Sequence, residues 1–280
     1  MPRGTTLTDQ ANIERRLWDL LDAQPQAVLD MARPETVTVV SGAVSSFADT
    51  TGRYIVTQST SANRPTYTTN ALNGKPVATG NGSGMRLTTA ATTGLLNNAP
   101  GVTMYVIARA TADTIATSRS LVFITSGTGP ARLSLASTQA AGTGYSSLIR
   151  RLDADTSLIL ASGLTSGFSE FRTVAIRFDA LSTTNNATIS ENGVNTATGT
   201  RSGSAGNISA TNPTLFAILG DSGSANTGPY AFAAGAIYHA AHPPWLQQKI
   251  EGNMAQARGI ANSLVLGHPY QFRPVLRGPG

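Results

Sequence analysis

Short runs of alternating apolar and polar residues recur along most of the chain, which is the pattern of half-buried β-strands. In residues 171–178, Val174, Ile176 and Phe178 share one face and Arg177 lies on the other. Residues 102–108 are almost continuously apolar, as expected for a central strand that is buried on both faces. Further strands are predicted at 37–40, 54–57, 121–125, 133–135, 147–152, 157–160, 188–191, 215–219 and 230–238.

Asn192-Gly193 follows the strand predicted at 188–191 and gives the strongest hairpin signal in the chain. A type I′ turn needs two residues that tolerate positive φ, and this pair supplies them. Many short strands separated by Gly, Ser and Thr clusters predict an antiparallel all-β sandwich.

Two helices are predicted outside these strands. Apolar residues of the first, at 8–22, lie on one face at Ile13, Leu17, Leu20 and Leu21, with Trp18 beside them. This segment either covers an open end of the sandwich or docks on a neighbouring subunit through Trp18.

The second helix follows His242-Pro243-Pro244, because proline is favoured in the first helical turn. Trp245, Ile250 and Met254 are predicted to form its buried stripe, and Gly259 its C-terminal cap.

Composition narrows the functional classes. Charged residues make up only 12% of the 280 residues, against about 25% in typical domains, which suits a β-protein packed in an assembly. The net charge of +5 is dispersed, and the densest basic pair, Arg150-Arg151, is followed at once by Asp153 and Asp155, so we expect no nucleic-acid binding. No apolar run reaches the roughly 18 residues needed to cross a membrane. Without cysteine there is no disulfide, Cys-based zinc site or thiol nucleophile.

Two distant blocks of sequence resemble the opening and closing parts of concanavalin A-like, laminin-G-type jelly-roll domains of bacteriophage structural proteins. The opening block covers residues 37–52, 57–67 and 72–77, and the closing block is an alanine-rich strand followed by Gln248-Lys249-Ile250-Glu251-Gly252. The resemblance spans roughly residues 28–272. It implies a two-sheet jelly roll with one C-terminal helix.

The chain also departs from this family. Phe47 stands where the family has tryptophan, Gly84-Met85 replaces an Asn-Asp pair, and Ala234-Gly235-Ala236 replaces acidic residues. These changes remove polar groups and keep packing groups. We therefore expect an N-terminal helical docking arm at 1–27, a jelly-roll sandwich at 28–262 and an extended tail at 263–280.

Catalytic motifs are incomplete. Gly220-Asp221-Ser222-Gly223 resembles the nucleophile segment of trypsin-like proteases, but all three histidines follow it, whereas in that family the base precedes the serine. Glycosidases need two carboxylates about 5–9 Å apart, and none of the five glutamates share a strand at the required spacing. We expect no enzyme activity.

Metal and cofactor signals are equally weak. His239-x-x-His242 lacks further zinc ligands, and Asp49 and Asp221 beside glycine are more typical of turns than of calcium sites. The segment Gly80 to Gly84 lacks the Lys-Ser/Thr of a phosphate loop. We predict no cofactor and no metal.

The sequence thus predicts a non-enzymatic virion structural protein, assembled in the host cytoplasm and forming homo-oligomers. It would dock on other virion proteins of capsid or tail through Ile13, Leu17, Trp18, Tyr270 and Phe272. The alternative is a tail-tip adhesin that binds host surface glycans through Tyr145, Asp221, Asn226 and Tyr230.

Overall fold

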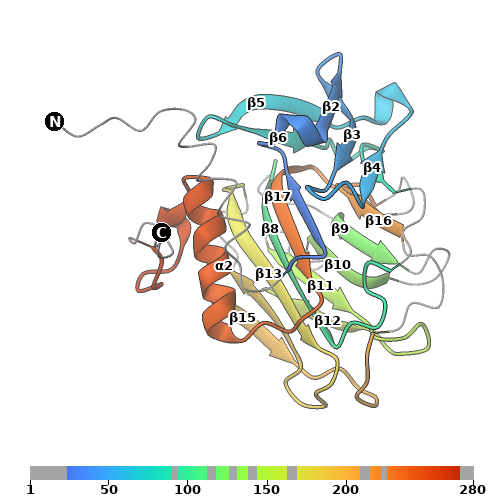
Figure 1. Ribbon diagram of the computed structural model, residues 1–280, viewed down its shortest axis with the longest axis vertical. Coiled ribbons are helices and arrows are strands. Elements are labelled where there is room, and N and C mark those ends of the chain that lie inside the picture. The colour runs from blue at the N-terminus through green and yellow to red at the C-terminus, as the bar shows by residue number, and fades with distance from the viewer. Residues whose placement is uncertain are drawn as a thin grey trace.

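The computed structural model describes residues 24–89, 94–111, 118–125, 131–137, 144–162, 169–208, 215–221 and 226–271. Within them the chain forms two layers of antiparallel strands, with one long helix against the outer face of one layer (Figure 1). The all-β jelly-roll sandwich predicted from the sequence is confirmed. The helix predicted at 8–22 lies outside the described residues.

The first layer contains the strands β15–β14–β13–β8–β17 in that order, with β1 and the β6–β5 pair both bound to the far side of β17. Their bounds are β1 Ala27–Asp30, β5 Thr66–Leu72, β6 Lys75–Thr79, β8 Gly101–Ala110, β13 Arg172–Asp179, β14 Ala187–Glu191, β15 Val194–Gly199 and β17 Tyr230–Tyr238.

The second layer contains β12–β11–β10–β9–β16–β7–β4–β3–β2. Its bounds are β2 Val37–Val40, β3 Ala43–Ala48, β4 Ile55–Thr57, β7 Leu87–Thr88, β9 Ser120–Thr125, β10 Ala131–Ser137, β11 Tyr145–Ile149, β12 Leu158–Ala161 and β16 Leu215–Ile218. A pairing of Ala43 with Thr66 joins the two layers.

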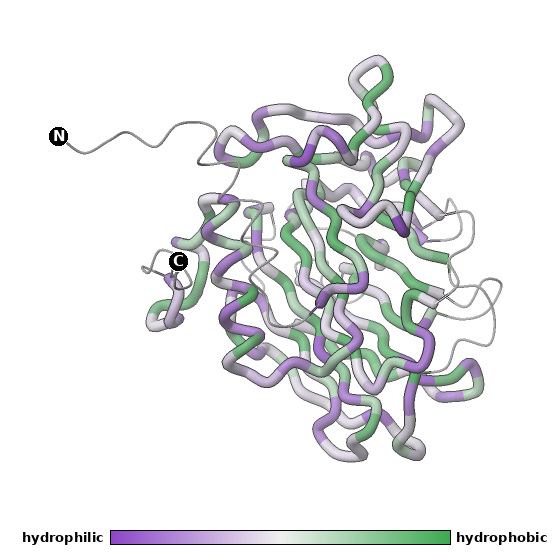
Figure 2. Tube along the Cα trace, viewed as in Figure 1, coloured by the Kyte–Doolittle hydropathy of each residue, from purple (hydrophilic) through white to green (hydrophobic). Residues whose placement is uncertain are grey.

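Strand alternation builds a core on each face of the first layer. Along β8, Val106 and Ala108 contribute to the core between the sheets, whereas Tyr105 and Ile107 face the helix. The prediction that this strand is buried on both faces is therefore confirmed. Hydropathy along the chain follows the same plan, with hydrophobic strands in the middle and polar loops at the margins (Figure 2).

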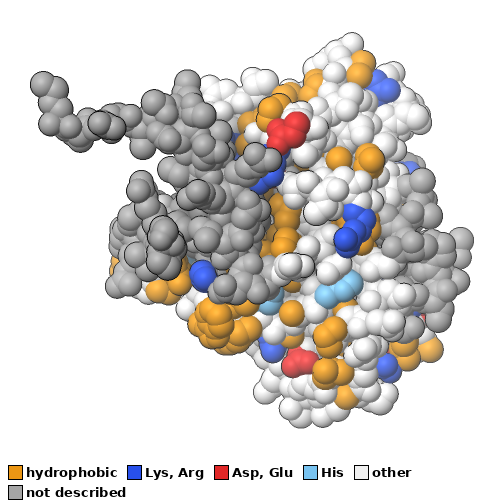
Figure 3. All heavy atoms as spheres, in the orientation of Figure 1, with side chains coloured by type: hydrophobic (Ala, Val, Ile, Leu, Met, Phe, Trp, Pro, Cys, Tyr) orange, Lys and Arg blue, Asp and Glu red, His pale blue; other side chains and the backbone are white. Residues whose placement is uncertain are grey.

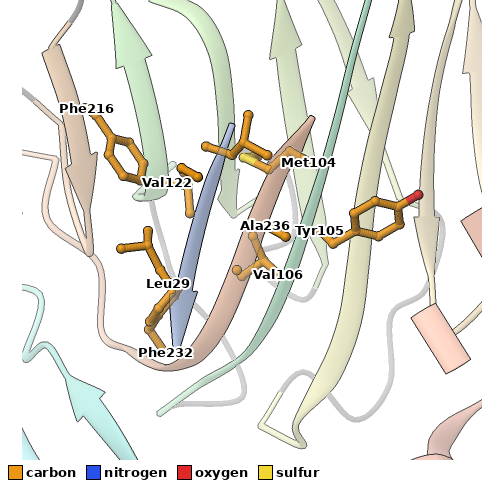
Figure 4. Close-up of a pocket in the computed structure, with 11 residues that line it drawn as sticks. Leu29, Met104, Tyr105, Val106, Val122, Phe216, Phe232 and Ala236 are labelled. Atoms are coloured by element: carbon orange, nitrogen blue, oxygen red, sulfur yellow. The ribbon is translucent and has the colours of Figure 1, made fainter. Parts of the chain in front are cut away.

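The core between the sheets is closely filled. A gap of about 10 Å³ lies among apolar side chains that include Leu29, Met104, Val122, Phe216 and Phe232 (Figure 4). A space of this size is at the lower limit for one water molecule and offers it no polar partner. It is a packing gap and not a ligand site.

The long helix, α2 Pro244–Ala257, begins at a proline as predicted. It ends in a Schellman motif: Ile260 N donates to Ala255 O at 2.9 Å and Gly259 N to Gln256 O at 3.0 Å, with Gly259 at φ +68°. Three short 3-10 turns complete the described elements: Pro34–Thr36, Ser61–Asn63 and Ala261–Ser263.

Two sequence predictions for these elements need correction. Ile250 and Met254 are buried against the sheet, but Trp245 is 58% exposed, because it lies at the first turn on the side away from the sheet. The strand predicted at 147–152 ends at Ile149, because residues 151–155 form a turn. The Asn192-Gly193 hairpin is confirmed, with φ +51° and +84°.

Candidate functional site at the rim of the sandwich

Three loops meet at one rim of the sandwich, where β17 begins and β9 begins. Ser120 N donates to Asn226 O at 3.0 Å, and Gly84 N donates to Thr227 Oγ1 at 2.8 Å. Tyr230 Oη donates to Arg119 O at 2.8 Å. These bonds hold the β6–β7 loop, the start of β9 and the end of the β16–β17 connection together.

Glycine makes this close approach feasible. A Cβ on Gly80 would lie 2.8 Å from Gly228 O, and one on Gly82 would lie 3.3 Å from Pro229 Cδ. Gly82 also has φ +77°, a conformation that favours glycine. The glycine-rich segment at 80–84 is therefore a packing feature of the rim and not a phosphate loop.

Asp221 and Asn226, both predicted ligand residues, lie together at this rim. Asn226 Nδ2 donates to Asp221 Oδ2 at 2.5 Å; Asp221 is 8% exposed, whereas Asn226 is exposed. The carboxylate therefore orients the amide of an exposed residue.

Tyr145 and Tyr230 also meet, but in the interior. Their rings stack with centroids 6.5 Å apart, and both residues are 0% exposed. Burial raises the pKa of both hydroxyls. The prediction that these tyrosines offer a surface for sugar stacking is wrong, because alternation along β11 and β17 turns both rings into the core.

Sequence reasoning missed Asn81 and Ser83, which are exposed at the same rim. Ser83 N donates to Asn81 Oδ1 at 2.8 Å, which fixes the amide in an Asx turn. The alternation of glycine with Asn and Ser at 80–84 was the available signal. Exposed amides and hydroxyls of this kind can exchange hydrogen bonds with sugar hydroxyls.

Three acidic residues of the described part have structural contacts. Glu191 and Glu251 are buried in separate contacts, with Arg172 and with Ser190 respectively. Asp49 accepts bonds from Tyr54 N and Thr51 N, which is the turn-forming role expected from its sequence context. Ser222 lies outside the described residues.

The described histidines are engaged in structural contacts. His239 Nε2 bonds to Leu95 O, and His242 Nδ1 lies 2.9 Å from Tyr105 Oη. Burial lowers the pKa of His242 to about 4, with Arg177 adding to the effect. Among the described residues, no group of three or more His, Cys, Asp or Glu could hold a metal ion.

Of the predicted docking residues, Ile13, Leu17, Trp18 and Phe272 lie outside the described residues. Tyr270 is half-buried and packs over α2. A Cβ added to Gly252 of that helix would lie 2.3 Å from the Cβ of Tyr270. Residues 264–271 form turns against α2 and not the predicted extended tail, as Gln256 Nε2 donates to Tyr270 O at 2.9 Å.

Charges on the face shown in Figure 3 are scattered singly and form no basic patch. In the part of the chain that the structure describes, no helix is both long and apolar enough to span a bilayer.

Comparisons with known proteins define the fold class. No family profile and no curated protein matches the sequence. Among solved structures, the binding domain of Paraclostridial mosquitocidal protein 1 is similar, with a TM-score of 0.58 and 13% identity over 87% of this chain. This chain spans 53% of that structure, about half its length.

Two further similar structures contain sugars. Domain 4 of AbnA, an extracellular arabinanase from Geobacillus stearothermophilus, was solved with arabinotriose (TM-score 0.55, 11% identity, 82% of this chain and 98% of that one). The botulinum neurotoxin serotype D ligand-binding domain was solved with N-acetylneuraminic acid (TM-score 0.54, 10% identity, covering 88% of this chain and 53% of that one). At these identities the likeness establishes the β-sandwich fold.

Proposed function

We propose that this chain is a non-enzymatic structural protein of a bacteriophage virion whose sandwich binds surface glycans at the rim formed by Asn81, Ser83, Asp221 and Asn226. The observation that carries the glycan role is the grouping of amide and hydroxyl side chains on loops that the glycines hold together. The sugar complexes of two similar folds support it. The virion setting rests on the sequence resemblance of the opening and closing blocks.

The non-enzymatic part of the proposal rests on the carboxylates. Hydrolysis of a glycosidic bond needs two of them facing a common space. In the described part of the chain, Glu191 and Glu251 are 0% and 1% exposed, and Asp153 and Asp155 are bound to arginines. A binding role needs none of these groups to be free.

A glycan array with the purified chain tests this function. We expect saturable binding to at least one bacterial surface glycan and a loss of roughly tenfold in affinity for Asn226→Ala, because one hydrogen bond to a sugar would be removed. Asn70→Ala, at an exposed position of β5, is the matched control and should bind as the wild type does. Absence of saturable binding, or equal loss in both variants, would contradict the glycan role.

A second function, particle decoration through protein contacts alone, is favoured by the exposed apolar side chains. Trp245 is 58% exposed and Leu266 is 84% exposed, and both are available for contact with a neighbouring protein. Under this alternative, cryo-electron microscopy of purified particles would show copies at symmetric positions on capsid or tail, with these residues covered. Purified particles that lack the chain would exclude both virion roles.

A further inference from the structure

Four arginines gather around one turn, at the end of β10 opposite the rim. Arg132 lies near the start of β10, Arg150 and Arg151 follow the end of β11, and Arg201 follows the end of β15. The other end of β10 is at the rim, where Ser137 N donates to Arg119 O at 3.0 Å. The arginine cluster and the rim therefore lie at opposite ends of one strand.

Two carboxylates partly neutralise the arginine cluster. Asp153 Oδ1 lies 2.8 Å from Arg132 Nη2. Asp155 Oδ2 lies 3.0 Å from Arg201 Nη1 and 3.8 Å from Arg151 Nε.

Arg150 has no carboxylate partner among the described residues; its Nη1 donates only to Asp153 O, at 3.3 Å. Four guanidinium groups against two carboxylates leave an excess of two positive charges.

Hydrogen bonding within the arginine cluster is also incomplete. The Nε atoms of Arg132, Arg150, Arg151 and Arg201 are all buried and have no acceptor in the described part of the chain. The side chains of Arg132 and Arg201 are 1% and 0% exposed. Buried donors normally have acceptors, and Arg86 Nη1 and Arg109 Nε are further buried donors without one in the described part of the chain.

Burial is the main cause of a lowered pKa at the Arg132 guanidinium. The charges of Asp153 and Asp155 raise this pKa, and those of Arg150 and Arg151 lower it.

The backbone holds these groups in place. A Cβ on Gly203 would lie 2.8 Å from Arg201 Nη1, and one on Gly206 would lie 2.9 Å from Arg151 Nη1. Both glycines have positive φ, +105° and +150°, which favours glycine. The loop after β15 is thus fitted around fixed guanidinium groups.

We propose that this arginine cluster binds the carboxylate of an acidic sugar at the surface side of Arg150 and Arg151. A guanidinium N–H can donate a charge-assisted hydrogen bond to a carboxylate, and the excess positive charge of the cluster favours an anion. A nucleic acid would instead need a longer basic stripe along its backbone. The proposal rests on the glycan role and adds to the rim a second contact, for an acidic sugar, at the opposite end of β10.

Titration calorimetry of the full chain tests this with trigalacturonate, its methyl ester and sodium sulfate as separate ligands. We expect saturable binding of trigalacturonate that weakens as salt is raised, and no binding of the ester. Arg150→Gln should weaken binding roughly tenfold, because a charge-assisted hydrogen bond is lost. Arg53→Gln, an exposed arginine between β3 and β4, is the matched control and should leave binding unchanged.

The outcomes separate the two levels of the proposal. Equal binding of acid and ester, or unchanged binding by both Arg150→Gln and Arg151→Gln, would overturn the arginine site. Binding of sulfate without trigalacturonate would show an inorganic-anion site and overturn the sugar ligand. If neutral glycans still bind at Asn226, the glycan role at the rim is retained. If no saccharide binds at all, both the arginine site and the glycan role are contradicted. Unchanged thermal unfolding confirms that each variant is folded.

Discussion

Ser190 on β14 donates from its Oγ to Oε1 of Glu251 on α2 at 2.6 Å, across the interface between helix and sheet. Gln247 Nε2 donates to Ser190 Oγ at 2.8 Å and to Glu251 Oε1 at 3.3 Å. Glu251 is 1% exposed, and its Oε2 has no partner among the described residues. The helix is thus attached to the sheet by the carboxyl group of Glu251, which forms no ion pair among the described residues.

We predict that Glu251 makes stability depend on pH. Burial raises the pKa of Glu251 from 4.5 to about 7, despite the bonds from Ser190 and Gln247 that lower it. Because the folded pKa is the higher one, the contribution of Glu251 is fully present below pH 4.5 and is lost as pH rises towards 7. Between pH 4.5 and 7, the free energy of unfolding of Glu251→Gln should therefore rise relative to that of the wild type by about 3 kcal/mol, at about 1.4 kcal/mol per pH unit.

Chemical denaturation at half-unit pH steps measures this difference. His242 titrates in the same range with the opposite slope, because its pKa is lowered, but its contribution cancels when variant and wild type are subtracted. Arg177, Tyr105 and Tyr238 also lie near this region, and both tyrosine pKa values are raised by burial. A difference that stays constant across this pH range would rule out a buried neutral Glu251.

The features that sequence predicted best are those fixed by local pattern. The continuous apolar run at 102–108 and the Asn192-Gly193 turn both have signals within a few residues, and both appear as expected. The strand β1 was missed because its four residues show no alternation: Ala27 to Asp30 are all buried. Its place beside β17 is a long-range property.

The candidate site was harder to predict for the same reason. Asp221 and Asn226 are five positions apart, and proximity along the chain was informative. Tyr145 and Tyr230 were proposed from residue type, which does not reveal which face of a strand is inside. The arginine cluster joins Arg132 to Arg201 across strands that only the fold brings together.

A further prediction concerns Gly252. Alanine in place of glycine within a helix usually stabilises by about 1 kcal/mol. Here a Cβ would lie 2.3 Å from Tyr270 Cβ, so Gly252→Ala should lower the free energy of unfolding and expose residues 264–271 to proteolysis. Tyr270→Gly removes that Cβ, and the double variant should lose less stability than the sum of the single variants. Simple additivity would show that the two residues do not touch in solution.

Truncation of Ile250 should cost much more stability than truncation of Trp245, although both residues were predicted in one buried stripe. Ile250 is 0% exposed, so Ile250→Ala should cost about 2–5 kcal/mol. Trp245→Ala should change stability by less than about 0.5 kcal/mol, because the side chain is mainly in solvent. Urea unfolding of both variants provides the measurement. A large loss for Trp245→Ala in the isolated chain would place this tryptophan in the core.

Arg172 and Glu191 give the last prediction. Arg172 Nη1 lies 2.6 Å from Glu191 Oε2, and the two residues are 6% and 0% exposed. Removing one partner of a buried pair leaves an unpaired charge, so Arg172→Met should cost about 3–5 kcal/mol. Replacing both, with Arg172→Met and Glu191→Leu, should restore most of that loss, because no charge then remains to be desolvated. Urea unfolding of the single and double variants measures the coupling, and additive losses would mean that the pair is solvated in the folded protein.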